Sequence, residues 1–265
     1  LVHGASASSM WWHAVLPRLA DHHRVIALDL SGHGDSGRRE TYDVRRWSRE
    51  VAGVVDAAGA DDVVLVGHSL GGRIAAITAA DRTDRVTGLV QVDSFLRDPA
   101  RHVPHVFPPR RPVVHYPTFD EAAARFKLLP DQPRPPEEVL EPVIRHLLRH
   151  DAGLGWTWKY DSAAIPAFDD VRPDEVARHL TCPVAYIWGA RSAVVNAEMA
   201  AYARATMPVV LERSVPLAYH HLILDRPDEA AEALLEAIAA VRGASRPASA
   251  VPAGQARRAP APMPP

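Results

Sequence analysis

Ser69 is the residue whose surroundings best suit it to act as a nucleophile. It lies in VVLVGHSLGGR, residues 63–73, where an apolar run passes directly into Gly-His-Ser-Leu-Gly and then into helix-forming residues. Gly-x-Ser-x-Gly between a strand and a helix is typical of a nucleophile elbow, a strained turn that lifts the serine hydroxyl clear of the sheet. The following helix N-terminus would let the amide of Leu70 stabilise developing negative charge. A glycine-rich turn with a solvated serine is the alternative interpretation.

The pair His220 and His221 supplies the candidate base. A serine hydroxyl is a poor nucleophile at neutral pH, so a neighbouring base must remove its proton. In the chain order that accompanies this kind of elbow the histidine comes last, and the pair follows the weak final strand pattern at 209–212. On order alone, either histidine fits the role.

The segments around these residues alternate between apolar strands and helices. Apolar runs predict strands at 24–30, 63–66, 86–92, 183–188 and 209–212. Helical patterns occupy 11–20, 43–58, 73–80 and 228–241. This alternation predicts an α/β fold, with a mostly parallel sheet covered by helices on both faces.

Length and composition narrow the classes of function. The 265 residues suffice for one large α/β domain with an insertion. The formal net charge of -2 provides no basic surface for nucleic acid and no polybasic membrane anchor. Cys182 is the single cysteine, which excludes an intramolecular disulfide and a multi-cysteine metal site. We expect a small-molecule substrate, no nucleic-acid or membrane partner, no cofactor and a cytoplasmic location, and we leave the oligomeric state open.

The rhythm of strands and helices is interrupted between residues 95 and 181. Prolines cluster at 104–117 and 130–136, with helical patterns at 119–128 and 137–149. We expect an inserted helical cap over the carboxyl ends of the strands, where ligands bind in open α/β sheets. The core would comprise residues 1–94 and 182–242. Residues 243–265, rich in Pro and Ala, would form a disordered tail.

Several motifs occur in the order found in the α/β-hydrolase superfamily, and the chain resembles its capped bacterial members over residues 1 to about 242. The motifs are HGASASSMWW, DLSGHGDSG, VGHSLGG, VDSF, YIWGA and HHLILDRP. The resemblance implies the α/β-hydrolase fold, a serine nucleophile, a histidine base after the last strand, an acid and a backbone oxyanion hole. It also implies two antiparallel strands ahead of LVHG, so we expect the N-terminal strands to be missing.

The resemblance also assigns individual roles. In similar motifs the first histidine of the pair is catalytic, which favours His220 and leaves His221 as a structural neighbour. Tyr219 stands where those motifs usually have glycine. The oxyanion donors would be the amides of Ala5, in the loop after the first strand, and of Leu70.

The acid has two alternative positions. Many superfamily members place an aspartate after the strand that here ends in YIWGA, with the spacing Gly-x-x-Asp, but this chain has Ser192 there. Other members take the acid from the end of the strand that follows the nucleophile helix, where Asp93 stands. We therefore predict Asp93 as the acid. If Asp93 is only a helix cap or loop residue, a Ser69–His220 dyad assisted by Ser192 is left.

Three further sets of residues have both a functional and a structural interpretation. Trp156 and Trp158 would either line a substrate pocket or belong to the core of the cap. His146 and His150 are four apart on a predicted helix, but the glutamate of a zinc-protease helix is missing, so we expect surface histidines and no metal. His68 is expected to pack and to hydrogen-bond beside the nucleophile.

These assignments predict a serine hydrolase that cleaves an acyl bond, foremost a carboxylic ester of a small to medium apolar substrate, through an acyl-enzyme. Carbon–carbon bond hydrolysis stays open because the same serine and histidine can serve it. A non-catalytic ligand-binding protein of this fold is the alternative from a different class. The dehalogenase and epoxide-hydrolase branches of the superfamily are disfavoured, since they would require aspartate at the elbow.

Overall fold

Four parallel strands form the centre of the protein in the computed structural model, which describes residues 1–94, 112–164, 171 and 173–244. They are β1 (Val63–His68), β2 (Val86–Val92), β5 (Val184–Gly189) and β6 (Val209–Val215), and their order in the sheet is β1-β2-β5-β6. Each neighbouring pair is parallel. The α/β class predicted from the alternation of strands and helices is therefore confirmed.

The first residues of the chain extend this sheet beyond β1. Val2 forms parallel bridges to both Gly67 and Leu28, and its amide donates to the Val66 carbonyl at 2.8 Å. The strand predicted over 24–30 is reduced to the single bridge at Leu28 among the described residues. At its end the prediction was too long because the backbone leaves the sheet after Leu28: the Leu30 amide donates to the ring of His3, 3.1 Å away, instead of to a strand.

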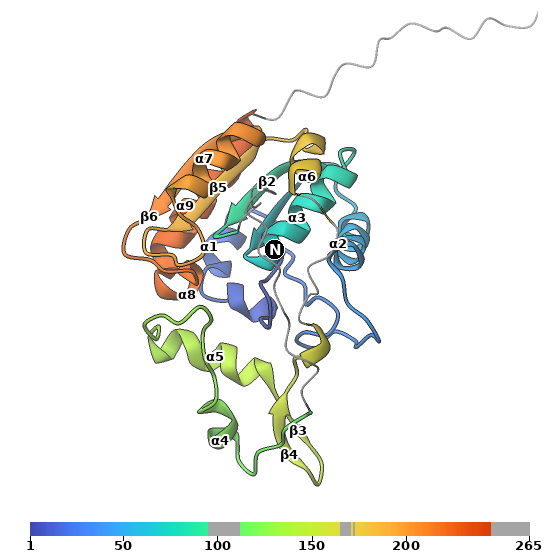
Figure 1. The fold of residues 1–265 in the computed structure, drawn as a ribbon, viewed down its shortest axis with the longest axis vertical. Helices are drawn as coiled ribbons and strands as arrows, with labels where there is room; N and C mark the ends of the chain where they lie inside the picture. The colour runs from blue at the N-terminus through green and yellow to red at the C-terminus, as the bar shows by residue number, and fades with distance from the viewer. Residues whose placement is uncertain (95–111, 165–170, 172, 245–265) are drawn as a thin grey trace, which may run out of the picture.

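Helices cover both faces of the sheet (Figure 1). Val66, Val90 and Ile187 point toward the face covered by α9 (Pro227–Ala244), whereas their strand neighbours Leu65 and Leu89 point toward the other. That alternation is what a sheet buried on both faces requires. The remaining helices outside residues 112–164 are η1 (Ser9–Trp12), α1 (Leu16–Ala20), α2 (Val44–Ala58), α3 (Leu70–Asp81), α6 (Pro173–His179), α7 (Ala197–Thr206) and α8 (Leu222–Asp225).

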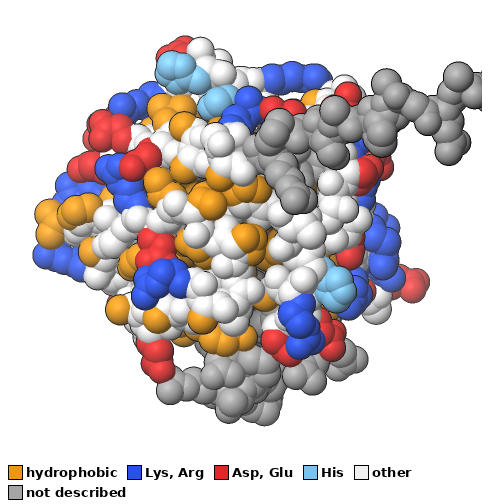
Figure 2. Space-filling model, turned by 90° about the horizontal axis from the view of Figure 1, so that it is seen from above, with side chains coloured by type: hydrophobic (Ala, Val, Ile, Leu, Met, Phe, Trp, Pro, Cys, Tyr) orange, Lys and Arg blue, Asp and Glu red, His pale blue; other side chains and the backbone are white. Residues whose placement is uncertain are grey.

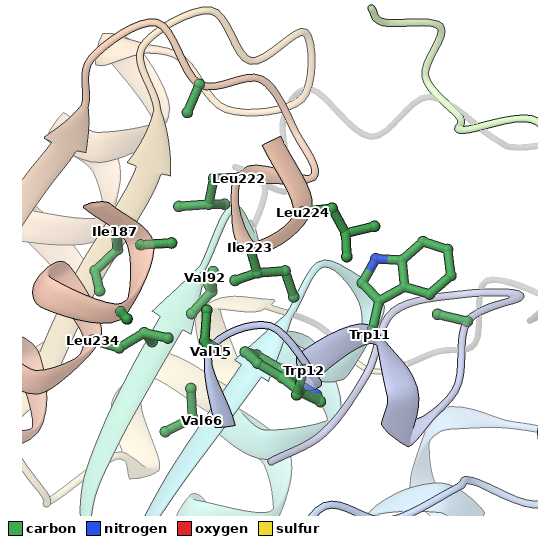
Figure 3. Packing of buried hydrophobic residues seen from close by; sticks show 14 of the residues in the cluster. Trp11, Trp12, Val15, Val66, Val92, Ile187, Leu222, Ile223, Leu224 and Leu234 are labelled. Atoms are coloured by element: carbon green, nitrogen blue, oxygen red, sulfur yellow. The ribbon is translucent and has the colours of Figure 1, made fainter. Parts of the chain in front are cut away.

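The face beneath α9 is packed by side chains from distant parts of the chain. Figure 3 shows Trp12 and Val15 from the N-terminal segment beside Val66 and Val92 of the sheet. The helix predicted over 11–20 is split between η1 and α1. The break has a local cause, because Pro17 lacks an amide hydrogen and its ring clashes with a continuing helix one turn earlier.

Two helices show how closely local signals set the boundaries. The side chain of Asp43 caps α2 by accepting the Arg46 amide at 2.7 Å, and Gly59 ends this helix with φ 64°. The C-terminal helix α9 begins with a proline and continues to Ala244, so it extends two residues into the segment predicted as a disordered tail. The rest of that segment, 245–265, lies outside the described residues.

Residues 112–164 form a separate group of elements on the side of the molecule where α8 lies (Figure 1). They are α4 (Phe119–Ala123), α5 (Glu137–Leu147), the antiparallel strands β3 (Leu148–Asp151) and β4 (Gly155–Trp158), and η3 (Ser162–Ala164). The group occupies the place predicted for the cap. The division into core and cap at 94/95 and 181/182 stays a prediction, and the prolines between 104 and 109 lie outside the described residues.

The cap contains a β-hairpin that the sequence pattern did not predict. The helix expected over 137–149 ends at Leu147, because Leu148 pairs with Trp158 and the chain continues as β3. His146 and His150 therefore do not share a helix, and the interpretation of them as two residues on one helical face was wrong. The helix expected over 119–128 is also shorter and ends at Ala123.

The opposite end of the molecule has a mixed surface. Figure 2 shows positive and negative side chains interspersed around a central group of apolar ones. A cavity of about 360 Å³ is lined by residues of β1, of the chain before it and of α9, among them Leu1, Ile26, Val63 and Ile238. No helix within the described ranges is both long and apolar enough to cross a membrane.

Candidate active site

Ser69 occupies a strained turn between β1 and α3. Its backbone has φ 54° and ψ -121°, a conformation that costs a non-glycine residue about 1–3 kcal/mol. The two glycines of the motif allow this turn. A Cβ on Gly67 would lie 2.3 Å from the Gly71 carbonyl oxygen, and one on Gly71 would lie 2.2 Å from the Val2 carbonyl oxygen. The spacing Gly-x-Ser-x-Gly thus follows from the close approach of strand, turn and helix.

His220 connects this serine to a carboxylate. Its Nε2 lies 3.1 Å from Ser69 Oγ, and its Nδ1 lies 2.8 Å from Asp93 Oδ1. An ionised carboxylate can only accept, so Nδ1 carries the proton and the lone pair of Nε2 faces the serine hydroxyl. The structure therefore brings together the three side chains that the sequence singled out, in an arrangement suited to general-base activation of Ser69.

Asp93 is fully buried at the end of β2, yet its carboxylate is well supplied with donors. Oδ1 accepts from His220 and from the hydroxyl of Ser192 at 2.6 Å, while Oδ2 accepts from the Gly189 amide at 2.8 Å. A buried carboxylate is tolerated in a fold when donors of this kind surround it. Asp93 is thus more than a loop or cap residue, because its carboxylate faces the imidazole directly.

Ser192, at the alternative acid position, contacts the same carboxylate oxygen as His220. Its hydroxyl oxygen accepts from the amides of Val194 and Val195, at 3.0 Å and 3.1 Å. The one hydroxyl hydrogen is then directed to Asp93 Oδ1. The two alternative positions for the acid, 93 and 192, thus lie beside each other. Asp93 at the end of β2 supplies the carboxylate, and Ser192 after β5 supplies a neutral donor to it.

The loop that holds Ala5 is shaped by buried histidines that the sequence analysis did not identify. The Ser6 amide donates to His33 Nε2 at 3.2 Å, and His3 Nδ1 donates to the Gly4 carbonyl at 2.7 Å. Burial lowers the pKa of His3 to about 4 and that of His33 to about 3, so both rings are neutral at pH 7. A signal for His33 was present in DLSGHGDSG, but nothing in its spacing connects it to a loop 27 residues away.

Gly4 brings the same loop against the nucleophile. A Cβ placed on Gly4 would lie 3.2 Å from Ser69 Cβ and 3.1 Å from His68 Nδ1. Ala5 follows directly in the chain, and Leu70 is the first residue of α3. The two residues predicted as oxyanion donors thus flank Ser69 on two segments, and their role stays a prediction.

The other two histidines near Ser69 serve the loop that carries His220. His68 donates through Nε2 to the His220 carbonyl at 2.9 Å, and burial and the neighbouring His220 hold its pKa well below the usual range. His221 accepts from the Trp11 indole at 3.3 Å and donates to the Leu129 carbonyl at 3.1 Å, and burial lowers its pKa to about 3. His221 therefore faces the cap, while His220 faces the serine.

His68, His220 and His221 each have one ring nitrogen that lies within 4.8 Å of one nitrogen in each of the other two rings. A metal ion would need lone pairs directed to a common point. Instead, both nitrogens of His220 and both of His221 have hydrogen-bond partners, and only Nδ1 of His68 lacks one. The donor set thus fits the hydrogen-bonded arrangement better than metal ligation.

Trp156 and Trp158 lie in an aromatic cluster of the cap. Trp156 packs edge-on against Phe119 at 5.2 Å between ring centres, and Trp158 stacks on Phe126 at 6.4 Å. Phe126 in turn lies 6.2 Å from Trp11, which reaches the loop of His220. Both tryptophans are partly buried, which fits a role in the cap core. Substrate contact by Trp156 and Trp158 stays a prediction.

His146 and His150 have separate surroundings. His146 Nε2 lies 3.7 Å from Asp29 and 3.9 Å from Asp35, both in the core loop that follows Leu28. Lys159 of the cap pairs with the same Asp35 at 2.5 Å. His150 packs edge-on against Trp156. The contacts of His146 thus join the cap to the core.

Comparison with known proteins identifies the family. The family model for the alpha/beta hydrolase fold matches residues 1–227. The chain is an alpha/beta hydrolase. Similar solved structures include a novel esterase of Mycobacterium tuberculosis, Rv0045c, with a TM-score of 0.74, 25% identity and coverage of 90% of this chain and 82% of that one. The thioesterase domain from the curacin biosynthetic pathway, at 22% identity and a TM-score of 0.71, covers 88% of each chain and shares the fold.

Curated relatives of this alpha/beta hydrolase match over shorter segments. A 2-hydroxy-6-oxo-2,4-heptadienoate hydrolase of Pseudomonas putida is 40% identical over 95 residues, which is 34% of this chain and 34% of that protein. A pyrethroid hydrolase of Sphingobium wenxiniae is 37% identical over 102 residues, 37% of this chain and 36% of that protein. The match spans about a third of the length of these relatives.

Proposed function

We propose that this alpha/beta hydrolase is a serine hydrolase that cleaves a carboxylic ester through an acyl-enzyme. The observation that carries the proposal is the position of His220, whose two ring nitrogens lie within hydrogen-bonding distance of Ser69 Oγ and Asp93 Oδ1. That arrangement supplies a nucleophile, a base and a group that fixes the tautomer of the base.

The proposed reaction has two halves. Ser69 Oγ attacks the ester carbonyl while His220 Nε2 takes its proton, and the resulting imidazolium is stabilised by the buried carboxylate of Asp93. The imidazolium returns the proton to the leaving alkoxide, which departs as an alcohol. A water molecule then attacks the acyl-enzyme, with His220 again as the base, and this step releases the carboxylic acid and restores Ser69.

The oxyanion would be held by the backbone amides of Ala5 and Leu70. The Ser6 amide is already engaged with His33. A donor of this kind is worth about 10² to 10³ in kcat when it is aimed at the developing charge.

The acyl or alcohol group of the substrate is proposed to be apolar and small to medium in size. The part of the cap that reaches the His220 loop carries the aromatic side chains Trp158 and Phe126, and Phe126 packs against Trp11 of η1. Relatives that are named as a pyrethroid hydrolase and a methylesterase, and a neighbour that is named as an esterase, favour an ester over other acyl bonds. We further propose a cytoplasmic enzyme that acts without a cofactor on a free small molecule.

A fluorophosphonate probe tests the nucleophile, because it reacts with activated serines. Wild type should be labelled covalently, Ser69→Ala should not, and mass spectrometry should place the adduct on Ser69. Short p-nitrophenyl esters should then be hydrolysed with a burst when deacylation is slower than acylation. Equal labelling of wild type and Ser69→Ala, or no labelling of either, would refute the assignment.

Carbon–carbon bond hydrolysis is the second candidate. It is favoured by the relative named 2-hydroxy-6-oxo-2,4-heptadienoate hydrolase, whose named substrate is an oxo acid and not an ester. Comparing kcat/KM for p-nitrophenyl esters with that for a vinylogous diketone acid separates the two. Turnover of the diketone alone would move the assignment to this candidate. Tight binding of either compound without turnover would indicate a ligand-binding protein.

A further inference from the structure

The loop that presents His220 is held from the core on one side. It leaves β6 at Val215, and the Arg191 amide donates to the Ala218 carbonyl at 2.8 Å. A Cβ on Gly189 would lie 2.2 Å from the Tyr219 carbonyl oxygen, which shows how closely this loop packs on the end of β5. His68 adds the hydrogen bond to the His220 carbonyl described above. None of these contacts comes from the cap.

On its other side the loop is closed by Asp225, the last residue of α8. One carboxylate oxygen of Asp225 accepts the Tyr219 amide at 2.9 Å. No lysine or arginine in the described part of the chain forms an ion pair with Asp225. The charged or titratable groups that act on it are His220, in the same loop, and Asp93 at the end of β2. Burial raises the pKa of Asp225 to about 6.

Gln132 of the cap forms hydrogen bonds with both the nitrogen and the oxygen of its side-chain amide, one to Asp225 and one to the His220 loop. Its Nε2 donates to the second carboxylate oxygen of Asp225 at 2.5 Å, and its Oε1 accepts the His221 amide at 3.2 Å. The orientation of the amide follows from its partners, because a carboxylate only accepts and a backbone amide only donates. Three residues earlier, the Leu129 carbonyl accepts from His221 Nε2. Figure 1 shows the chain before α5 approaching α8 at this point.

We propose that Gln132 is a positioning residue through which the cap holds the loop of the catalytic base, so that cap placement and the Ser69–His220 distance are coupled. The residues on either side of His220 are both fixed by this one arrangement: Tyr219 through Asp225, and His221 through Gln132 directly. If the cap segment moves away, Asp225 loses its only side-chain donor among the described residues and the loop is held from the core side alone. The inference rests on the proposed role of His220 as base.

The test alters the donor at position 132 and the acceptor at position 225, first one alone and then both together. Gln132→Glu keeps the acceptor for the His221 amide but sets a second carboxylate against Asp225. Gln132→Glu combined with Asp225→Asn restores complementarity, because the asparagine amide can donate to the introduced carboxylate while its carbonyl still accepts from Tyr219. Asp131→Asn, on an exposed neighbour in the same cap segment, changes a charge without touching this arrangement and is the matched control.

The readout is the rate constant for phosphonylation of Ser69 between pH 6 and 9, with thermal unfolding as a check that each variant is folded. Gln132→Glu should react up to about 100-fold more slowly than wild type at pH 8, since misplacement by about 1 Å has such effects. The deficit should shrink toward pH 6, where the two carboxylates can share a proton. The double variant should recover most of the rate, and Asp131→Asn should match wild type throughout.

The outcomes separate this proposal from the one on which it rests. No labelling of wild type would refute the proposed function. Labelling of wild type with an unchanged rate for Gln132→Glu would overturn only the role of Gln132. An equal deficit for the single and double variants at every pH would also overturn it, because a general loss of packing, and not the donor and acceptor pattern, would then be the cause.

Discussion

Asp93→Asn should lower kcat far more than Ser192→Ala, although Ser192 donates to the same Asp93 oxygen that faces His220. The Asp93 carboxylate faces only donors: His220 and Ser192 at Oδ1, and Gly189 at Oδ2. An asparagine must turn its NH₂ group toward one of these oxygen positions. At Oδ2 it would oppose the Gly189 amide, which cannot become an acceptor.

The more favourable orientation of the asparagine therefore places its NH₂ group toward His220. Nδ1 must then accept, the proton moves to Nε2, and the nitrogen that should receive the serine proton is occupied. Loss of the correct tautomer lowers kcat by about 10⁴ in serine hydrolases, equivalent to about 5 kcal/mol of transition-state stabilisation. Binding of a small ester should change little, because Asp93 is fully buried and does not reach the substrate.

Ser192→Ala removes one of three donors and leaves the tautomer intact. A hydrogen bond to a charged group is worth about 1.5–3 kcal/mol, and only the part that grows as His220 becomes charged affects the rate. We expect a decrease of about tenfold in kcat. The assay is steady-state hydrolysis of p-nitrophenyl butyrate, with fluorophosphonate titration to count active sites. A decrease for Ser192→Ala that exceeds the one for Asp93→Asn would refute the assignment of the acid.

Three further predictions concern stability. Burial lowers the pKa values of His3, His33 and His221 below those of the unfolded chain, so the unfolded chain takes up protons first as the pH falls. The free energy of unfolding should therefore be unaffected by these groups above pH 6.5 and should fall as the pH drops from 6.5 toward 4. His3 alone accounts for on the order of 3 kcal/mol, which urea unfolding across this pH range can measure. Gly71→Ala should abolish folding or lower Tm strongly, since a backbone oxygen lies 2.2 Å from the added Cβ. Ser69→Gly should eliminate activity yet raise the free energy of unfolding by about 1 kcal/mol, because the positive φ is no longer strained; a less stable variant in the same urea assay would contradict this.

The parts of the site that were predictable are those encoded in contiguous residues. The elbow around Ser69 combines an apolar strand, two glycines with little room for a side chain and a helix, and all of these signals lie within 19 residues, 63–81. His220 and Asp93 followed from the order of motifs in a resembling superfamily, and in the structure His220 faces Ser69 while Asp93 faces His220. The residues that support them were not predictable in the same way. Ser192 and Asp93 are 99 positions apart, and no local pattern reveals that their side chains meet.

In the cap, the end of the helix predicted over 137–149 was wrong. Apolar residues continue at helical spacing past Leu147, and the pattern alone gives no reason for the helix to stop. The helix ends because Leu148 pairs with Trp158, and this contact overrides local helix propensity. The same hairpin separates His146 from His150. The split of the N-terminal helix, in contrast, has a local signal in the sequence, because Pro17 cannot continue a helix that begins at residue 11.

Ser192 and His220 share one oxygen of Asp93, and this sharing restricts how the acid of such an enzyme can change position during evolution. If position 192 carried an aspartate while Asp93 stayed, two carboxylates would lie side by side in one buried place, and one would have to hold a proton. If Asp93 were lost first, the imidazole would have no counter-charge at all. A lineage that relocates its acid between these strands must therefore cross a poorly active ancestor or change both codons together, which would keep each descendant group on the strand it inherited.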